Sequence, residues 1–389
     1  MCDIVSEALR AGISRRSMLA ALGAGAAALG TSAAASPQAG ASARSAVAEQ
    51  YRTRVVLLGT AGGPPWWNGS KRSGISTAVV VGDRYYVVDA GHGVGQRIRE
   101  ARLGNWKDDE QGPLDAMRAI FLTHLHSDHV SDLNNLLLPA NGRQANPEPV
   151  QVWGPGNRGQ LPPLFGPPPA PAVTAPENPT PGTVELVDLL TRAFATDYND
   201  RAFDNRKPPA AEMFTAHDVP IPAEYTGDPN GNPHPRMSPV PFYEDDRVRV
   251  SATLVKHAPV FPALAFRFDT DDGSVVLAGD TARSENLIEM ATGADVLVHE
   301  VMEAKWLETF LPPPRNDVQE GLFQHLLSSH TTVEEVGPIA DEAGVATLVL
   351  SHLAPAAWPE EEWRRAGDNF SGTLVIGHDL DETGVGTPS

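Results

Sequence analysis

Short runs of β-branched and aliphatic residues, separated by loops, recur along the chain and predict strands in two groups. The first group lies in the front half and comprises Val55–Leu58, Thr77–Val81, Tyr85–Val88, Ala119–Leu122 and Val150–Trp153. The second group follows later and comprises Val248–Lys256, Ala263–Phe268, Ser274–Leu277, Val296–Val298, Thr347–Leu350 and Leu374–Ile376. The chain is therefore expected to form two sheets.

Helical periodicity lies between these strands, at Val94–Arg102, Asp132–Leu138, Val184–Ala195 and Val333–Ala343. Helices in these places would cover the outer faces of two packed sheets. The pattern predicts an α/β fold with four layers, an αββα sandwich. A Pro-rich stretch at about residues 154–241 interrupts it, either as an insertion or as a disordered linker between two domains.

Composition narrows the range of partners. Hydrophobic residues make up 41% of the 389 residues, which is enough for a substantial core. The formal net charge is −19 and no basic face is visible, which argues against a polyanionic partner such as a nucleic acid. The only cysteine is Cys2, which lies in an N-terminal segment that resembles a removable export signal, described next. Any metal in the mature protein must therefore be bound by histidines and carboxylates.

The N-terminal segment has the layout of an export signal. Arg15 and Arg16 precede an apolar run from Ala20 to Leu29, and Ala33–Ala35 offers a small-residue cleavage site. The twin arginine is typical of the Tat route, and the apolar run is too short to span a membrane. We therefore expect residues 1–50 to be a signal peptide and linker, and the mature protein to be periplasmic or extracellular, without stable membrane insertion.

The motif HxHxDH at residues 124–129 begins where a predicted strand ends. Because side chains alternate along a strand, His124 and His126 can point the same way, and the turn that follows presents Asp128 and His129. Without a metal, such a cluster would leave costly buried polar groups. The spacing predicts two adjacent divalent ions, with zinc preferred for imidazole ligands and manganese or iron as alternatives.

This motif resembles the signature of the metallo-β-lactamase superfamily, and the resemblance extends from Val55 to Asp379. Later segments fit that family's order: Lys256-His257-Ala258-Pro259, Leu277-Ala278-Gly279-Asp280-Thr281 and Ser351-His352-Leu353. The resemblance implies one ion on His124, His126 and His257, a second on Asp128, His129 and His352, and Asp280 shared between them. Since these residues flank the Pro-rich stretch, we interpret it as an insertion in one catalytic domain of residues 51–389.

Within the superfamily the chain resembles the branch that contains ribonuclease Z and a group of exported arylsulfatases. Three segments carry this likeness: the glycine turn at residues 55–64, Val298-His299-Glu300 and Ser329-His330-Thr331-Thr332. The resemblance implies that Glu300 orients His330, which donates a proton to the leaving group, and with Asp128 they are the candidate catalytic residues. Asp89, at a strand end, is expected to orient a ligand histidine.

The long basic arm of many ribonuclease Z enzymes has no counterpart here, which favours the arylsulfatase-like group. We therefore expect an exported dinuclear hydrolase of small-molecule sulfate or phosphate esters, with water activated by the two ions as the nucleophile. A lactone or carboxylic ester hydrolase on the same metals, or a non-catalytic metal-binding protein, are the alternatives. No nucleic-acid partner is expected, and a homo-oligomer is left open.

Other residues receive no specific role from the sequence. Some lie on loops that could line a pocket, namely Trp66, Trp67, Arg72 and His92. The remaining histidines have no motif around them and are expected to be solvated or structural: His217, His234, His325 and His378.

Overall fold

The computed structural model describes residues 46–103, 112–138, 148–165 and 168–388. Nearly all of the predicted export signal and linker lies outside these ranges, except for the short helix α3, Ala46–Gln50. The structure groups Ser45–Ser389 into one unit. Among the described residues, no helix combines the length and the hydropathy needed to cross a membrane.

Two seven-stranded sheets form the centre of the described chain, and all the strands predicted from the sequence are present. The first sheet contains, in spatial order, β14 (Glu382–Gly384), β1 (Thr53–Gly59), β2 (Ser76–Val81), β3 (Arg84–Val88), β4 (Met117–Phe121), β5 (Val150–Gly154) and β6 (Phe214–Asp218). The second contains β13 (Thr373–Ile376), β12 (Thr347–Ala354), β11 (Val296–Met302), β10 (Ser274–Leu277), β9 (Leu264–Asp269), β8 (Arg249–Leu254) and β7 (Val240–Glu244). Each sheet has an antiparallel and a parallel part.

The inner faces of the two sheets share one apolar core. Phe121 of the first sheet packs edge-on against Phe268 of the second, with ring centroids 5.3 Å apart at 89°. Strands β1, β2 and β11 are buried at every position, because their outward side chains are covered by helices. Each fully buried aliphatic or aromatic side chain contributes roughly 1.5–3 kcal/mol, so this double burial is the main source of stability.

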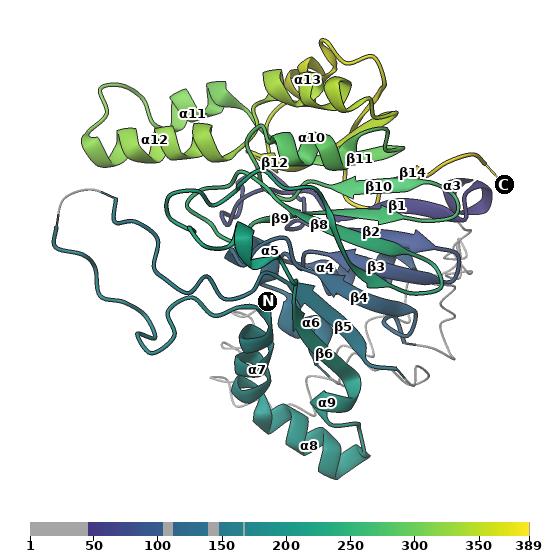
Figure 1. The fold of residues 1–389 in the computed structure, drawn as a ribbon. Helices are drawn as coiled ribbons and strands as arrows, with labels where there is room; N and C mark the ends of the chain where they lie inside the picture. Colours follow the sequence, from purple (N-terminus) through teal and green to yellow (C-terminus); the bar gives the residue numbers. More distant parts are fainter. Residues whose placement is uncertain (1–45, 104–111, 139–147, 166–167, 389) are drawn as a thin grey trace, which may run out of the picture. The chain divides into compact units, whose positions relative to one another are not determined.

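Helices cover the outer faces, and Figure 1 shows the resulting layers. The first sheet carries α4 (Val94–Ala101), α6 (Leu133–Leu137), α7 (Thr183–Ala193), α8 (Ala195–Asn205) and α9 (Ala210–Met213). The second carries α10 (Glu285–Ala291), α13 (Val333–Ala343), α14 (Glu360–Trp363) and the 3₁₀ turn η3 (Arg364–Gly367). The apolar stripe of α13, with Val336, Ile339, Ala340 and Ala343 buried, has the expected helical spacing. The predicted four-layer αββα sandwich is confirmed.

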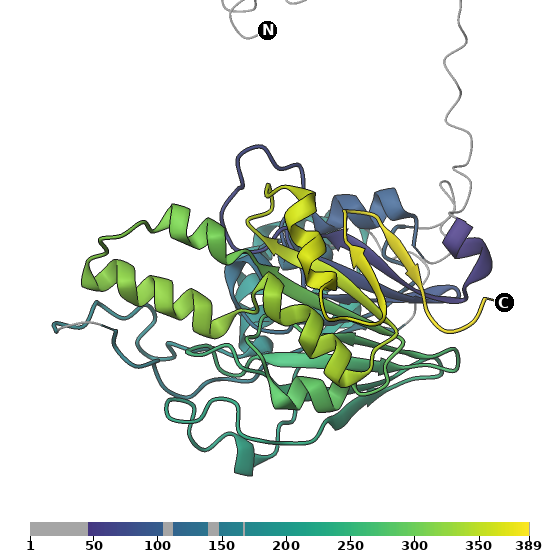
Figure 2. The same cartoon turned by 90° about the horizontal axis from the view of Figure 1, so that it is seen from above.

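Two further helices, α11 (Ala304–Phe310) and α12 (Asp317–Ser329), project from the carboxyl end of β11 in both views (Figures 1 and 2). Leu307 of α11 and Phe323 of α12 bury a small apolar cluster of their own. Helix α12 begins with a capping box in which Asn316 and Gln319 each bond the other's backbone N–H. This helix pair lies next to the strand ends that carry the predicted site.

The Pro-rich stretch at residues 154–241 contains more regular structure than the sequence predicted. It holds α7, α8, α9 and the 3₁₀ turn η2 (Ala223–Tyr225), and it supplies β6, the edge strand of the first sheet. It ends in β7, the edge strand of the second sheet, which includes Pro241. An edge strand tolerates proline because one side of its backbone needs no ladder bonds. This stretch therefore supplies one edge strand to each sheet.

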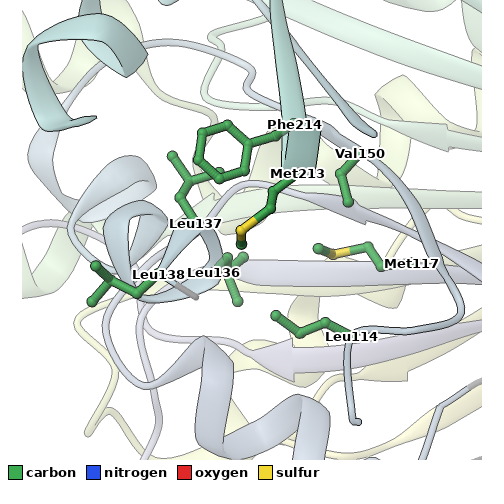
Figure 3. A pocket seen from close by; sticks show the side chains of 8 residues that line it. All are labelled: Leu114, Met117, Leu136, Leu137, Leu138, Val150, Met213 and Phe214. Atoms are coloured by element: carbon green, nitrogen blue, oxygen red, sulfur yellow. The ribbon is translucent and has the colours of Figure 1, made fainter. Parts of the chain in front are cut away.

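Packing on the outer face of the first sheet leaves one small apolar gap of about 10 Å³ (Figure 3). Its lining side chains are Leu114, Met117, Leu136, Leu137, Leu138, Val150, Met213 and Phe214. A gap of this size is at the lower limit for a single water, and the side chains that line it are apolar. It is a packing defect and not a ligand site.

Candidate metal centre

The carboxyl ends of β4, β8, β10 and β12 position the side chains that the sequence singled out. Loops that follow β4, β8 and β10 carry His124, His257 and Asp280, whereas His352 lies near the carboxyl end of β12 itself. Strands β10, β11 and β12 run parallel, so their carboxyl ends open on the same edge of the second sheet. Ligands bind at this edge in open α/β sheets, which makes the arrangement a natural site.

The first group consists of His124, His126 and His257, whose facing ring nitrogens lie within 4.8 Å of one another. His124 and His257 are buried, whereas His126 is exposed. The two rings that come from one segment, His124 and His126, have centroids 4.6 Å apart. Buried His124 and His257 thus form the inner side of this group, and His126 forms its solvent-exposed side.

The second group consists of Asp128, His129, Asp280 and His352, all buried, with ligand atoms again within 4.8 Å of one another. Asp128 and His129 come from the one-turn helix α5 (Ser127–Val130), which follows the strand-end histidines directly. The Oδ2 atom of Asp128 lies 3.3 Å from His352 Nε2 and 3.5 Å from His129 Nε2. Three chain segments therefore converge on this second position.

Asp280 faces both groups. Its Oδ1 atom lies 3.3 Å from the Nε2 atoms of His129 and His352. Its Oδ2 atom lies 4.0 Å from His124 Nε2 and 3.9 Å from His257 Nε2. One carboxylate oxygen is thus directed at each group, which is the shared position that the family resemblance implied for Asp280.

The donor atoms fit a pair of cations. Among the described residues, buried Nε2 atoms of His124, His129 and His257 have no hydrogen-bond partner, although burying an unpaired polar atom is costly. Burial lowers the pKa of His257 to about 3 and that of His124 well below its ordinary value. These two imidazoles are therefore neutral, the form that donates a lone pair to a metal.

Contacts behind the imidazoles fix their orientation. The Nδ1 atom of His129 lies 2.8 Å from Asp89 Oδ2, the carboxylate that the sequence expected to orient a ligand histidine. The Nδ1 atom of His257 lies 3.0 Å from the carbonyl oxygen of Ser329, at the end of α12. Both contacts leave Nε2 facing the site. The role of Ser329 could not be predicted, because a backbone carbonyl leaves no signal in the residue type.

His330 and Glu300 form a pair beside these groups. The Nδ1 atom of His330 lies 2.9 Å and 3.1 Å from the two carboxylate oxygens of Glu300 and 4.0 Å from Asp280 Oδ2. Glu300 is buried within β11 and also accepts a hydrogen bond from the backbone N–H of Thr281, at 2.8 Å. Burial opposes charge on His330, yet the Glu300 carboxylate raises the pKa of His330 to about 9.

A cavity of about 480 Å³ adjoins the site at Asp128. Its lining includes the four loop residues that the sequence placed near a pocket, Trp66, Trp67, Arg72 and His92. It also includes Lys71, which lies on the same loop and belongs to no motif. Elsewhere, His217 stacks on Trp153 with ring centroids 4.2 Å apart and bonds Gln151, which is a structural use of a histidine.

Comparison with known proteins places this geometry in a family. Residues 71–320 match the model of the Metallo-beta-lactamase superfamily. The chain belongs to this superfamily. Ribonuclease Z of Mycobacterium bovis (strain BCG / Pasteur 1173P2) is 32% identical over 334 residues, covering 84% of this chain and 96% of that protein. Ribonuclease Z of Mycolicibacterium paratuberculosis is 33% identical over 341 residues, covering 86% and 99%. The chain is thus a metal-dependent hydrolase of the ribonuclease Z branch.

Solved structures agree on the fold. The short form of human tRNase Z superposes with a TM-score of 0.53 at 16% identity, covering 85% of this chain and 99% of that one. The metallo-β-lactamase fold protein YhfI from Bacillus subtilis superposes with a TM-score of 0.51, also at 16% identity, covering 85% and 99%. At this identity the likeness shows the shared αββα architecture.

The relatives correct two expectations. The predicted substrate, a small-molecule sulfate or phosphate ester, was wrong, and so was the expectation of no nucleic-acid partner, because relatives that match over nearly their whole length are ribonucleases. The arylsulfatase-like assignment and the lactone and non-catalytic alternatives fall with them. The expectation of no nucleic-acid partner rested on the net charge of −19, which does not describe the charge near the site. Net charge sums the whole surface, whereas Lys71, Arg72 and His92 gather beside the candidate metal ligands.

Proposed function

We propose that this protein hydrolyses phosphodiester bonds in RNA with two divalent cations, as an enzyme of the ribonuclease Z type. The relatives support the substrate class, since the match to this chain covers 96% and 99% of the length of two ribonuclease Z proteins. The observation that carries the proposal is the His330–Glu300 pair, held at 2.9 Å beside Asp280. Cleavage of RNA expels a poorly stabilised alkoxide, which requires such a proton donor.

His124, His126 and His257 would hold one cation, and Asp128, His129 and His352 the other, with Asp280 between them. Nitrogen and carboxylate donors of this kind suit zinc, which is the metal we propose. The pair of cations would activate water as the nucleophile and neutralise charge on the phosphate oxygens. The exposed edge of His126 and the cavity beside Asp128 leave the phosphate a way in.

The protein's own proton donor is His330. The Glu300 carboxylate accepts the hydrogen on His330 Nδ1 and fixes the ring, so that Nε2 is the nitrogen left to serve the substrate. Because Glu300 raises the pKa of His330 to about 9, the imidazole is protonated at neutral pH. It can then protonate the leaving oxygen, and the buried carboxylate stabilises its charge until that step.

The test uses purified, metal-loaded protein with a precursor tRNA that carries a 3′ trailer, an unstructured RNA and p-nitrophenyl sulfate. We expect chelator-sensitive cleavage of RNA and no turnover of the sulfate ester. His330→Ala should lower the rate on RNA by about 10²- to 10⁴-fold and lower it less on bis(p-nitrophenyl) phosphate, whose leaving group needs little protonation. Wild-type protein that holds two metals and leaves every RNA intact would refute the proposal.

We also propose that the N-terminal segment directs export by the Tat route. The support is the order of Arg15 and Arg16, the apolar run and Ala33–Ala35, which lie outside the described residues. Replacing both arginines by lysine should retain the protein in the cytoplasm, as measured by cell fractionation. Export of the doubly substituted chain at the wild-type level would contradict this.

A further inference from the structure

The cavity beside the candidate metal centre is built mainly by the loop of residues 61–74. At about 480 Å³ it falls within the range of roughly 300–1,000 Å³ that holds small ligands. It shares Asp128 with the candidate metal site, so a ligand in the cavity lies next to the reacting phosphate. Whatever it binds is therefore a part of the substrate adjacent to the bond that is cut.

The cavity wall carries two cationic side chains, Lys71 and Arg72, although the whole chain is acidic. Lys71 is exposed, and among the described residues it forms no ion pair with a carboxylate. Arg72 is fixed in place, because it donates to Thr60 Oγ1 at 2.6 Å and to the carbonyl of Gly377 at 2.5 Å. His92 is exposed on the same wall. The negative charges of Asp379, Asp381 and Glu360 act on Arg72, so Lys71 is the cation of this wall that has no ion pair among the described residues.

The carboxylates on this wall are already engaged. Asp128 belongs to the candidate metal ligands. Asp132 accepts hydrogen bonds from the backbone N–H of Gly93 at 2.8 Å and from Asn135 at 3.0 Å. Lys71 is therefore the positive charge that the cavity offers to an incoming anion, whereas Asp128 faces the candidate metal site and Asp132 is held by two neutral donors.

An aromatic surface stands at the edge of the same loop. Trp66 is 90% exposed, an unusual state for so large an apolar side chain. Its neighbour Trp67 is anchored: the indole Nε1–H donates to Gly62 O at 2.7 Å, and the ring meets Trp306 of α11 at 5.3 Å and 76°. The anchored tryptophan holds the loop, and the exposed one presents a free indole face.

We propose that this cavity binds one unpaired nucleotide of the RNA, with its base stacked on Trp66 and its phosphate beside Lys71. The inference rests on the proposed function and extends it to the part of the substrate next to the scissile bond. A flat apolar ring beside an unpaired cation, Lys71, matches the two halves of a nucleotide, and this combination is how single-stranded RNA is held without base-specific contacts. A free sulfate or phosphate ion would use the cations and leave Trp66 without a role.

The direct test is a calorimetric titration of the metal-loaded protein with adenosine 5′-monophosphate and, separately, with inorganic phosphate. Trp66→Ala should weaken binding of the nucleotide by about 5- to 150-fold, which corresponds to one lost base stack, and should not change binding of phosphate. Trp66→Phe should restore most of the affinity. Phe203→Ala, which removes an aromatic side chain that is 87% exposed on α8, is the matched control and should bind as wild type.

Lys71 is tested by salt dependence. In binding of a short single-stranded RNA, Lys71→Ala should reduce the slope of log affinity against log salt by about 0.7, as expected for one lost phosphate contact. Arg192→Ala on α7 is the control cation, since Arg192 is 75% exposed and paired with Asp188 away from the site. Metal content and thermal unfolding of each variant are measured in parallel, so that loss of the fold is recognised.

The two proposals fail separately. If Trp66→Ala and Lys71→Ala are folded, hold both metals and bind adenosine 5′-monophosphate as wild type does, the nucleotide pocket is wrong even though RNA is cleaved. If the nucleotide is bound through Trp66 but the wild-type protein cleaves no RNA, the pocket stands and the proposed ribonuclease activity is wrong.

Discussion

Replacing Asp89 by asparagine should loosen the second metal position while leaving the fold nearly intact. Asp89 is buried: Oδ2 lies 2.8 Å from His129 Nδ1 and accepts the Thr123 hydroxyl at 2.8 Å, and Oδ1 accepts the backbone N–H of Thr123 at 2.8 Å. The backbone at Asp89 has a φ of 60°, a left-handed conformation that asparagine tolerates at least as well as aspartate. The substitution therefore changes one atom's chemistry without new strain.

The magnitude follows from donor counting. An asparagine has one acceptor oxygen, so if it keeps the bond to Thr123, its NH₂ group meets the hydrogen on His129 Nδ1. His129 must then lose its partner or move the proton to Nε2, the nitrogen that faces Asp280. A hydrogen bond to a charged group contributes about 1.5–3 kcal/mol, which corresponds to an affinity for the second cation lower by about 10- to 150-fold.

The assay is a competition titration with a chromophoric chelator that resolves two binding steps. Only one of the two binding steps should shift, namely that of the cation held by Asp128, His129 and His352. The other should not change, because His124 and His257 make no direct contact with Asp89 among the described contacts. Asp245→Asn is the matched control: its carboxylate accepts from Tyr86 at the end of the sandwich away from the site and should affect thermal unfolding alone. Wild-type affinity for both cations in Asp89→Asn would refute the reasoning.

Three further outcomes are expected. His126→Ala should lose metal and activity together, whereas His330→Ala should keep both metals; elemental analysis beside RNA cleavage separates them, and full turnover of RNA by His330→Ala would rule out its acid role. The protonated form of His330, whose pKa is raised to about 9, is present below that pH and lost above it, so the rate on RNA should fall as pH rises through this range, and the fall should vanish in His330→Ala. Removing metal with a chelator should lower the unfolding temperature, since saturation at 100 times Kd contributes about 2.7 kcal/mol; an unchanged unfolding temperature would speak against metal at this position.

Much of the fold could be predicted because its signals are local. Buried strands such as β2 and β10 read as unbroken aliphatic runs, and α13 shows helical spacing. The sequence pattern did not predict the edge strands β6, β7 and β14: β6 lies in the Pro-rich stretch, β7 contains Pro241, and β14 has only three residues. An edge strand has fewer buried positions, so its pattern is weak.

The candidate site was predictable for a different reason. Its side chains stand at strand ends with recognisable neighbours, and the strand order brings His124, Asp280 and His352 together. What the sequence could not supply was anything carried by the backbone or by loop geometry, such as the Ser329 carbonyl behind His257. The positive charge of Lys71 in the cavity could not be predicted either. In the sequence it is a single lysine in a strongly acidic chain, and only the conformation of its loop places it beside the site.

The position of Asp280 has a consequence for assembly. Its carboxylate reaches toward His129, delivered by the first sheet, and toward His257 and His352, delivered by the second. Bound cations would link the two sheets through ligands that are far apart in the sequence. His352 and Asp128, for example, are separated by 224 positions. A nascent chain could not capture both ions until its final strands had joined, so metal uptake would mark the completion of folding.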